Sequence, residues 1–200
     1  MRTSETAAPG APEISPRAKR ADAQRNYDSV VQAAREAFAE AGTSTALEDI
    51  ARRAGVGIGT LYRHFPNRQA LLEAVYVGEV QELSRSAEEF SQLPPWEALA
   101  GWLDRFVSYL ATKRALANEM LQYVDRSAPL FQECRSLMYS AGEPLLERAQ
   151  AAGAVREDVA LPDIIQLLMG IANLPAAEPE TVQRLLTVAL DGLRYLPAAG

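Results

Sequence analysis

The chain has 200 residues and a formal net charge of −6; 48% of its residues are hydrophobic and 23% are charged, as in folded globular proteins that bury a substantial core. Its one cysteine, Cys134, and one histidine, His64, exclude an internal disulfide, a zinc site made of cysteines and a cluster of histidine ligands. No apolar leader follows the N-terminus, and the uncharged stretch 164–177 is too short to span a bilayer, so we expect a cytoplasmic protein without a membrane segment.

The negative charge is concentrated in the C-terminal part of the chain. Residues 17–76 carry a net charge of +2, whereas residues 77–200 carry −7. Because the distribution of charge matters more than its sum, the acidic total does not exclude nucleic acid as a partner of the N-terminal part.

Residues 1–16 show no periodicity and are rich in alanine and proline, which predicts a disordered tail. A basic arm follows, made of Arg17, Lys19, Arg20 and Arg25. The arm is either a solvated lead-in or an extension that contacts phosphate groups, and the sequence leaves both interpretations open.

Helical periodicity begins near Asp22. Apolar residues then recur at three- and four-residue spacing up to Ala41, and Gly42 suits the end of that helix. The segment Thr45–Glu48 has the pattern of a capping box, in which the threonine side chain caps a second helix and the glutamate reaches back to it.

The second helix is predicted to point Leu47, Ile50, Ala51 and Ala54 inward and to end before Gly55. A turn of only three residues separates it from a third segment, residues 58–65. Pro66 stops that segment, because proline lacks an amide donor and restricts the residue before it.

The remainder of the chain is predicted to be helical, and no segment has the alternation of a convincing strand. Asn67 suits the N-cap of a long helix that buries Leu71, Leu72, Val75 and Tyr76. Pro144 is expected to kink or divide one of the later helices. Those later helices are expected at residues 96–110, 113–124, 129–153, 162–171 and 180–195. The predicted fold class is therefore all-α.

Two short helices joined by a tight, glycine-containing turn form a helix-turn-helix, whose second helix can enter the major groove of DNA. Polar residues of the third segment, among them Thr60, Tyr62 and Arg63, are expected to face outward. Since many helical hairpins share this pattern, the pattern alone leaves DNA binding and ordinary helix packing equally open.

The order of residues in this region is more specific. Residues 33–42, 47–51 and 54–68 resemble the TetR family of regulators, and the family's Gly-Thr-Leu-Tyr-x-x-Phe string stands unchanged at 59–65. The resemblance covers about residues 26–76. It implies a three-helix DNA-binding domain at 17–67, joined to a larger helical ligand-binding and dimerisation domain at 68–200.

The resemblance also implies which residues contact DNA. They are Thr45, Gly59, Thr60, Tyr62, Arg63, His64 and Arg68. Thr45 and Arg68, the latter in place of the family's usual lysine, would hold phosphates, and Tyr62 and His64 would lie mainly on the DNA backbone. Without the resemblance, the interpretation of His64 as a polar surface residue at a helix end is favoured, whereas Tyr62 is equally well a half-buried core residue.

Two residues depart from the family pattern. Gly57 replaces the usual serine or threonine N-cap, which weakens the cap by only a few tenths of a kcal/mol. Ile58 stands where a polar residue is common, which puts a hydrogen bond to a base in doubt and leaves contact with a thymine methyl group.

An apolar ligand pocket is expected among aromatic and methionine side chains of the C-terminal part. These are Trp102, Phe106, Tyr109, Met120, Tyr123, Phe131 and Met138. The alternative for each of them is ordinary core packing. Cys134 is interpreted as a small buried hydrophobic residue and not as a redox sensor.

The helix at about 162–171 is apolar on almost every side, and the last helix, at about 180–195, carries a wide apolar stripe. We expect the two to form a four-helix interface across a two-fold axis. The partners implied are a second copy of the chain, a pseudo-palindromic operator in double-stranded DNA, and a small-molecule ligand of unknown identity.

The resulting hypothesis is a repressor that a ligand releases from its operator by tilting the long helix that starts at Asn67. Two alternatives remain open. An enzyme would need a nucleophile and base or a metal site, and the sequence offers neither, so no catalytic residue, metal or cofactor is assigned. A helical interaction module would not retain duplex DNA at low salt.

Overall fold

The computed structural model describes residues 16–121, 123, 128–174 and 178–194. In this part of the chain the backbone forms eight helices: α1 Pro16–Ala41, α2 Leu47–Arg53, α3 Ile58–His64, α4 Arg68–Phe90, α5 Pro95–Met120, α6 Pro129–Ala151, α7 Leu161–Ala172 and α8 Pro179–Leu193. The described residues contain no strand beyond one isolated bridge, between Val155 and Arg194. The prediction of an all-α fold is confirmed.

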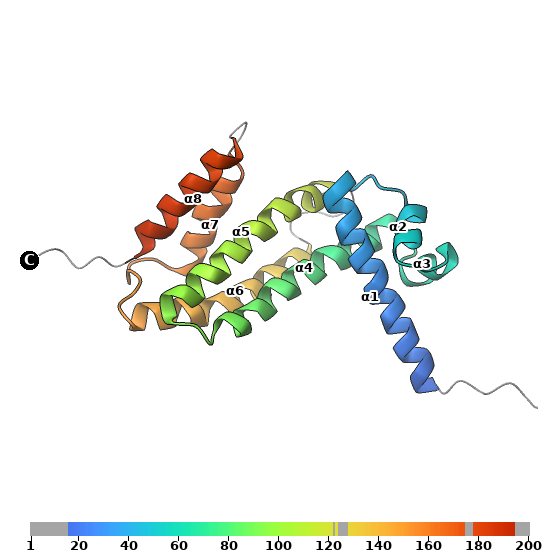
Figure 1. Ribbon diagram of the computed structural model, residues 1–200, viewed down its shortest axis with the longest axis horizontal. Coiled ribbons are helices and arrows are strands. Elements are labelled where there is room, and N and C mark those ends of the chain that lie inside the picture. Colours follow the sequence, from blue (N-terminus) through green and yellow to red (C-terminus); the bar gives the residue numbers. More distant parts are fainter. Residues whose placement is uncertain (1–15, 122, 124–127, 175–177, 195–200) are drawn as a thin grey trace, which may run out of the picture.

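The helices are arranged in three groups along the molecule (Figure 1). In the middle, α4, α5 and α6 pack against one another; α1, α2 and α3 gather near the start of α4; and α7, with α8 on it, packs on α5 and α6 at the other end. Within the described ranges, no helix is long and apolar enough to cross a membrane.

Trp102 of α5 is the centre of the packing between the three middle helices. Its ring is fully buried, and its indole nitrogen donates a hydrogen bond of 3.1 Å to the backbone oxygen of Leu83 in α4. From α6, Gly142 leaves the room that the ring needs, because a Cβ atom at that position would lie 2.4 Å from it. A single large side chain therefore contacts all three helices.

The first helix begins earlier than predicted. It starts at Pro16, six residues before the expected start at Asp22, so the basic arm and the last residue of the predicted tail are helical. Residues 1–15 of that tail lie outside the described residues. The arm has no apolar stripe, but its alanine, lysine and arginine residues favour helix, and Pro16 suits a first helical position.

The two helices predicted at 96–110 and 113–124 are one helix, α5, which ends at Met120. Only Ala111 and Thr112 separate the predicted pieces, and neither residue stops a helix. Pro144 likewise does not divide α6, where it lies at an exposed position. The predicted last helix, 180–195, is observed as Pro179–Leu193, and Tyr195 lies outside the described residues.

Candidate DNA-binding surface and core pocket

The second and third helices are held at a fixed angle by a three-residue turn. Gly55 adopts a φ of +68°, which residues with a side chain rarely adopt, and the amide of Val56 then bonds to the oxygen of Ala51 at 3.0 Å. Leu61 of α3 is fully buried, as is Ile50 of α2, so the inner faces of both helices belong to the core.

The predicted capping box at Thr45 is wrong. The N-cap of α2 is Ala46, and no side chain caps the helix. Instead the Thr45 hydroxyl donates to the oxygen of Gly42 at 2.9 Å, because the turn that begins at Gly42, with its φ of +83°, brings that carbonyl within reach. Thr45 stabilises the end of α1, and its phosphate contact remains a prediction.

The outward face of α3 carries three of the five DNA contacts predicted in this helix. Tyr62 is 45% exposed and Ile58 38%, and Gly59 and Arg63 are exposed beside them, whereas Thr60 is half-buried. Residues 58, 59, 62 and 63 share one side of a helix, since they repeat after one turn. This side of α3 is therefore free to meet another surface.

His64 is placed differently from its neighbours in α3. It is half-buried, with its ring 6.1 Å from that of Tyr27 in α1 in an edge-on arrangement, and Tyr27 also lies 5.0 Å from Phe65. The sequence analysis missed Tyr27. Its only signal was its position three residues before the buried Val30, on the helix that supports α3.

Arg68 joins the start of α4 to the turn between α1 and α2. Its two terminal nitrogens donate to the backbone oxygens of Thr43 and Thr45, each at 2.6 Å. The preceding Asn67 caps α4 by accepting from the amide of Ala70 at 2.8 Å, which confirms the predicted cap. Arg68 thus has a structural role, and its phosphate contact stays a prediction.

Replacing Arg68 with alanine is expected to lower the free energy of unfolding by about 1–3 kcal/mol, because two hydrogen bonds from a charged donor are lost. Urea unfolding measures this change. The matched control is Arg63→Ala, which removes an exposed arginine and should cost less than about 0.5 kcal/mol. Equal losses of unfolding free energy in both variants would show that the hydrogen bonds of Arg68 contribute nothing to stability.

Several of the predicted pocket residues come together in the core. Trp102, Phe106 and Tyr109 follow one another along α5, with ring centroids 6.3 and 6.1 Å apart, and all three are buried. Met120 and Met138 are also buried. All five residues belong to one buried hydrophobic core.

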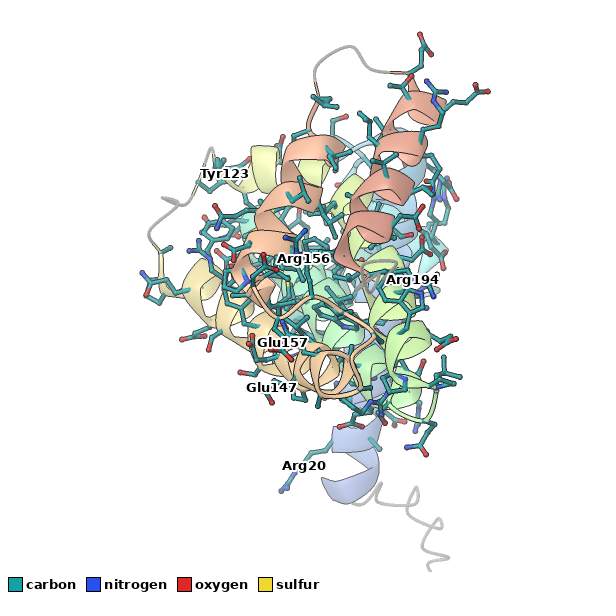
Figure 2. All side chains as sticks on the ribbon, turned by 90° about the vertical axis from the view of Figure 1, so that its left-hand side faces the viewer. Arg20, Tyr123, Glu147, Arg156, Glu157 and Arg194 are labelled. Atoms are coloured by element: carbon teal, nitrogen blue, oxygen red, sulfur yellow. The ribbon has the colours of Figure 1, made fainter. Side chains whose placement is uncertain are left out.

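Two of the predicted pocket residues lie outside this core group. Tyr123 follows the end of α5, is 47% exposed and lies at the surface (Figure 2), so its assignment to the pocket stays a prediction without support from burial. Phe131 is half-buried and packs edge-on against Tyr76 of α4 at 5.4 Å. Tyr76 was not predicted as a pocket residue.

Polar groups lie within this aromatic core. Burial raises the pKa of Tyr109 well above its ordinary value, and the neighbouring Tyr76 raises it further. Burial also raises the pKa of Tyr76, while its hydrogen bond with Tyr109 lowers it. Cys134 is buried nearby, as expected for a small hydrophobic residue. The core therefore contains two neutral phenol groups next to each other.

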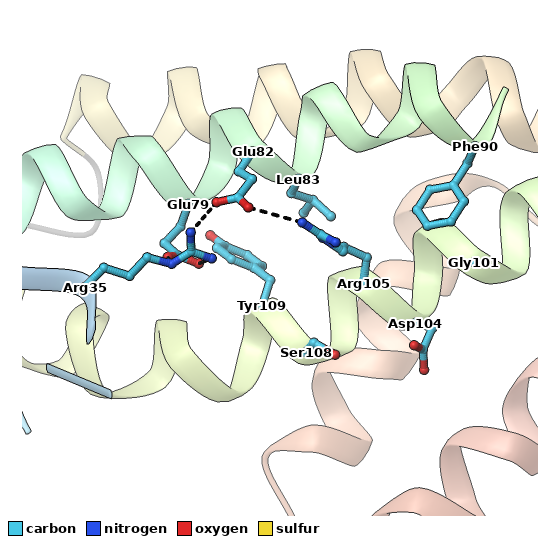
Figure 3. Close-up of a pocket in the computed structure, with 10 residues that line it drawn as sticks. All are labelled: Arg35, Glu79, Glu82, Leu83, Phe90, Gly101, Asp104, Arg105, Ser108 and Tyr109. Atoms are coloured by element: carbon cyan, nitrogen blue, oxygen red, sulfur yellow. Dashed lines mark hydrogen bonds and ion pairs between the residues drawn. The ribbon is translucent and has the colours of Figure 1, made fainter. Parts of the chain in front are cut away.

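A separate cleft of about 450 Å³ opens between α1, α4 and α5 (Figure 3). Its lining consists of Arg35, Glu79, Glu82, Leu83, Phe90, Gly101, Asp104, Arg105, Ser108 and Tyr109. Of the predicted pocket residues only Tyr109 lines it. Charged side chains dominate this cleft, and the sequence analysis missed them because their partners lie on different helices.

Comparison with known proteins supports the interpretation of both parts of the chain. A family model described as bacterial regulatory proteins, tetR family, matches residues 30–75. A second model, described as transcriptional regulator SbtR-like, C-terminal domain, matches residues 94–195. Together the two matches extend over most of the described chain.

Individual proteins agree with these models. The crystal structure of a TetR transcriptional regulator, SCO0520 from Streptomyces coelicolor, is 41% identical over 84% of this chain and 98% of its own, with a TM-score of 0.72. The crystal structure of a TetR transcription regulatory protein from Mycobacterium vanbaalenii is 34% identical over 88% of this chain and 99% of its own, also with a TM-score of 0.72. The HTH-type transcriptional repressor SCO4008 of Streptomyces coelicolor is 25% identical over 86% of this chain and 91% of its own length.

Proposed function

This chain belongs to the TetR family of bacterial transcriptional regulators, and from that premise we propose that it is a homodimeric repressor that a small molecule releases from its operator. The observation that carries the proposal is the exposed side of α3, supported from behind by a buried Leu61 and presented by a rigid turn. In this proposal residues 17–67 bind DNA, and residues 68–200 bind the ligand and the second copy.

The geometry of α3 supports the proposed DNA contacts. A helix in the major groove contacts bases and phosphates through the side chains of its exposed side. In α3 these are Tyr62 and Arg63, and Gly59, which has no side chain, allows the helix to approach the DNA closely. Thr45 and Arg68 lie together at the edge of this unit, joined by the hydrogen bond from Arg68 to the Thr45 oxygen. Phosphates are the proposed partners of that edge.

The proposed dimer contacts are supported by apolar side chains that α7, α8 and the segment between them leave in solvent. These are Leu167, Met169, Leu174, Leu185 and Val188, between 37% and 66% exposed. Exposed apolar side chains concentrated on neighbouring helices indicate an interface. Pairing α7 and α8 with the same helices of a second copy covers them, and the two-fold axis implies two half-sites about one helical turn of DNA apart.

Ligand release is proposed to act through α4. The aromatic core between α4, α5 and α6 would open to hold an apolar molecule with a hydrogen-bonding group near Tyr76 and Tyr109. Because α4 begins at Arg68, whose side chain bonds to the turn between α1 and α2, a shift of α4 would move α2 and α3. The ligand can shift the equilibrium only by its difference in affinity for the two arrangements.

The variant Tyr62→Ala tests the proposed DNA-binding surface. It is expected to weaken binding to duplex operator DNA by ~10–100-fold, the equivalent of losing one or two good contacts, without changing the unfolding midpoint, because the side chain is 45% exposed. Fluorescence anisotropy with a labelled operator, found by selection from a random duplex pool, measures the affinity.

Tyr123→Ala is the matched control, since Tyr123 is also an exposed tyrosine, at 47%, and does not belong to α3. It should bind the operator as the unaltered protein does. Normal binding by Tyr62→Ala would refute the assignment of α3 as the reading helix. A protein that selects no duplex and retains none at low salt would instead be a helical interaction module.

A further inference from the structure

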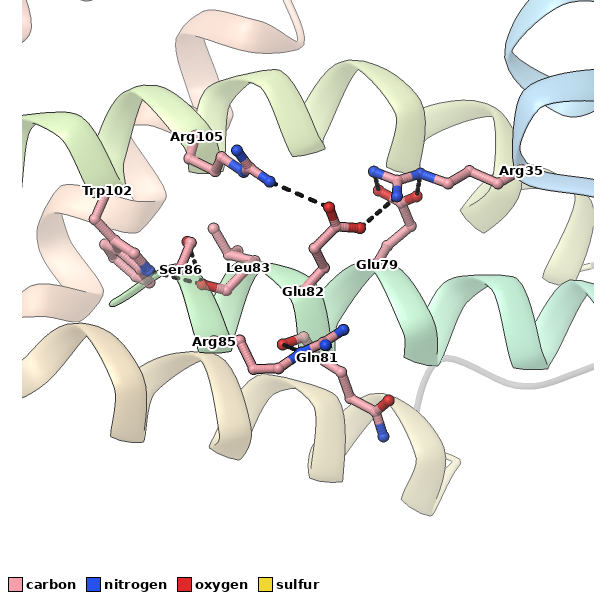
Figure 4. A network of polar contacts seen from close by, with 9 residues as sticks. All are labelled: Arg35, Glu79, Gln81, Glu82, Leu83, Arg85, Ser86, Trp102 and Arg105. Carbon is pink, nitrogen blue, oxygen red and sulfur yellow. Dashed lines mark hydrogen bonds and ion pairs between the residues drawn. The ribbon is translucent and has the colours of Figure 1, made fainter. Parts of the chain in front are cut away.

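One carboxylate of α4 connects two arginines that belong to different helices (Figure 4). One oxygen of Glu82 accepts a charge-assisted hydrogen bond from Arg35 of α1, and the other oxygen accepts from Arg105 of α5 at 3.1 Å. One turn earlier on α4, Glu79 also pairs with Arg35, through the Nε atom and at 3.5 Å through Nη2. We call these four residues the α1–α4–α5 bridge.

The α1–α4–α5 bridge lies partly out of solvent, which strengthens it. Glu79 is 6% exposed, and Arg35 and Glu82 are each 35% exposed. Burial raises the pKa of Glu79, and the positive charge of Arg35 opposes that rise. A carboxylate so buried needs a cation beside it, so Arg35 cannot leave Glu79 without a cost in free energy.

The bridge is placed where the DNA-binding helices meet the middle helices. Arg35 belongs to α1, which packs on α2 and α3 and contacts α4 again where Val31 faces Gly78. Arg105 lies three residues after Trp102, on the helix that lines the aromatic core. Glu82 is therefore a polar link between α1 and α5 through α4.

We propose that Glu82, by dividing its carboxylate between Arg35 and Arg105, fixes α1 and the reading helix on α4 and α5, so that Arg35 and Glu82 are positioning residues for operator binding. This inference rests on the proposed function. A dimer that reads two half-sites needs both α3 helices at a set separation, and freedom of α1 relative to α4 lowers the fraction of molecules in that arrangement. If α5 shifts around a bound ligand, the α1–α4–α5 bridge would transmit that movement to α1.

The variants Arg35→Gln and Glu82→Gln test the proposal against Arg85→Gln. Arg85 is an exposed arginine of α4 whose hydrogen bond among the described residues stays within its own helix, to the oxygen of Gln81 at 3.4 Å, so it controls for the loss of one positive charge in Arg35→Gln. Arg35→Gln and Glu82→Gln should weaken operator binding ~10-fold. Binding to a scrambled duplex of equal length should change less than ~2-fold, because it depends on phosphate contacts and not on half-site separation.

A double-mutant cycle tests the link itself. Arg35 and Arg105 each bond to Glu82, so the effects of Arg35→Gln and Arg105→Gln on operator affinity should be non-additive when Glu82 is present. In the Glu82→Gln protein the same two substitutions should be additive within ~2-fold. Additivity in both backgrounds would overturn the proposal, since the two arginines would then act independently.

Two further results would also overturn the proposal. Equal weakening of binding to the operator and to the scrambled duplex would indicate an effect of charge alone. A lower unfolding midpoint with unchanged operator affinity would indicate that the bridge only stabilises the fold. Failure of the proposed function is recognised separately, because the unaltered protein would then bind no operator. In that case hydrogen–deuterium exchange decides: amides of α1 should exchange ~10-fold faster in Arg35→Gln than in Arg85→Gln if the bridge holds α1.

Discussion

Replacing Val188 with arginine is expected to separate the dimer and to lower operator affinity by on the order of 100-fold, because each copy then binds a half-site alone. Val188 is 66% exposed on α8, so the substitution leaves the folded monomer unstrained. In the proposed interface it would place two like charges across the two-fold axis, away from water. The side of α8 that carries Val188 also contains the exposed Leu185 and Gly192, where a Cβ atom would meet no other atom within 4 Å.

Light scattering after size-exclusion chromatography measures the mass, and anisotropy measures operator binding. Gln183→Arg is the control, since it adds the same charge at an exposed position on another side of α8 and should remain dimeric. A dimer of unchanged affinity in Val188→Arg would mean that the copies associate through some other surface.

Replacing Trp102 with alanine is expected to lower the free energy of unfolding by about 3–5 kcal/mol. The ring is fully buried between α4, α5 and α6, and its loss leaves a cavity over Gly142 and removes the hydrogen bond to Leu83. Urea unfolding followed by circular dichroism measures the change.

If Trp102→Ala does not fold, Trp102→Phe gives the same information at a smaller cost. The comparison is Trp96→Ala, which removes a half-buried ring that packs against the Arg194 guanidinium, 5.1 Å away, and should cost less than Trp102→Ala. A loss below about 1 kcal/mol for Trp102→Ala would contradict the central place of this ring in the core.

Local signals in the sequence predicted most of the fold. The turn at Gly55, the cap at Asn67 and the apolar sides of α2 and α4 depend on neighbours within a few residues, and the structure contains them as expected. The errors arose where a local pattern had competing outcomes. The Thr45 hydroxyl found a carbonyl behind it instead of the amide ahead, and α5 continued past Leu110 because nothing there stops a helix.

The candidate DNA-binding surface was likewise predictable only where it depends on residues close together in the sequence. The exposed side of α3 follows from helical spacing within seven residues, so Tyr62 and Arg63 could be assigned to it from sequence, whereas Thr60 and His64, also expected outside, are half-buried. The contacts of Tyr27 with His64 and of Arg35 with Glu82 join residues 37 and 47 positions apart, as set by the register in which helices pack. Periodicity contains no information on that register, which is why the α1–α4–α5 bridge and the cleft appeared only in the structure.

The central claim, that this protein reads operator DNA through α3, is tested most directly by footprinting the DNA upstream of its own coding sequence with purified protein. We expect two protected half-sites about one helical turn apart, with protection lost steeply as salt rises and absent with Tyr62→Ala. Protection that persists unchanged with Tyr62→Ala, or no protection of this DNA or of any duplex selected by the protein, would contradict the claim.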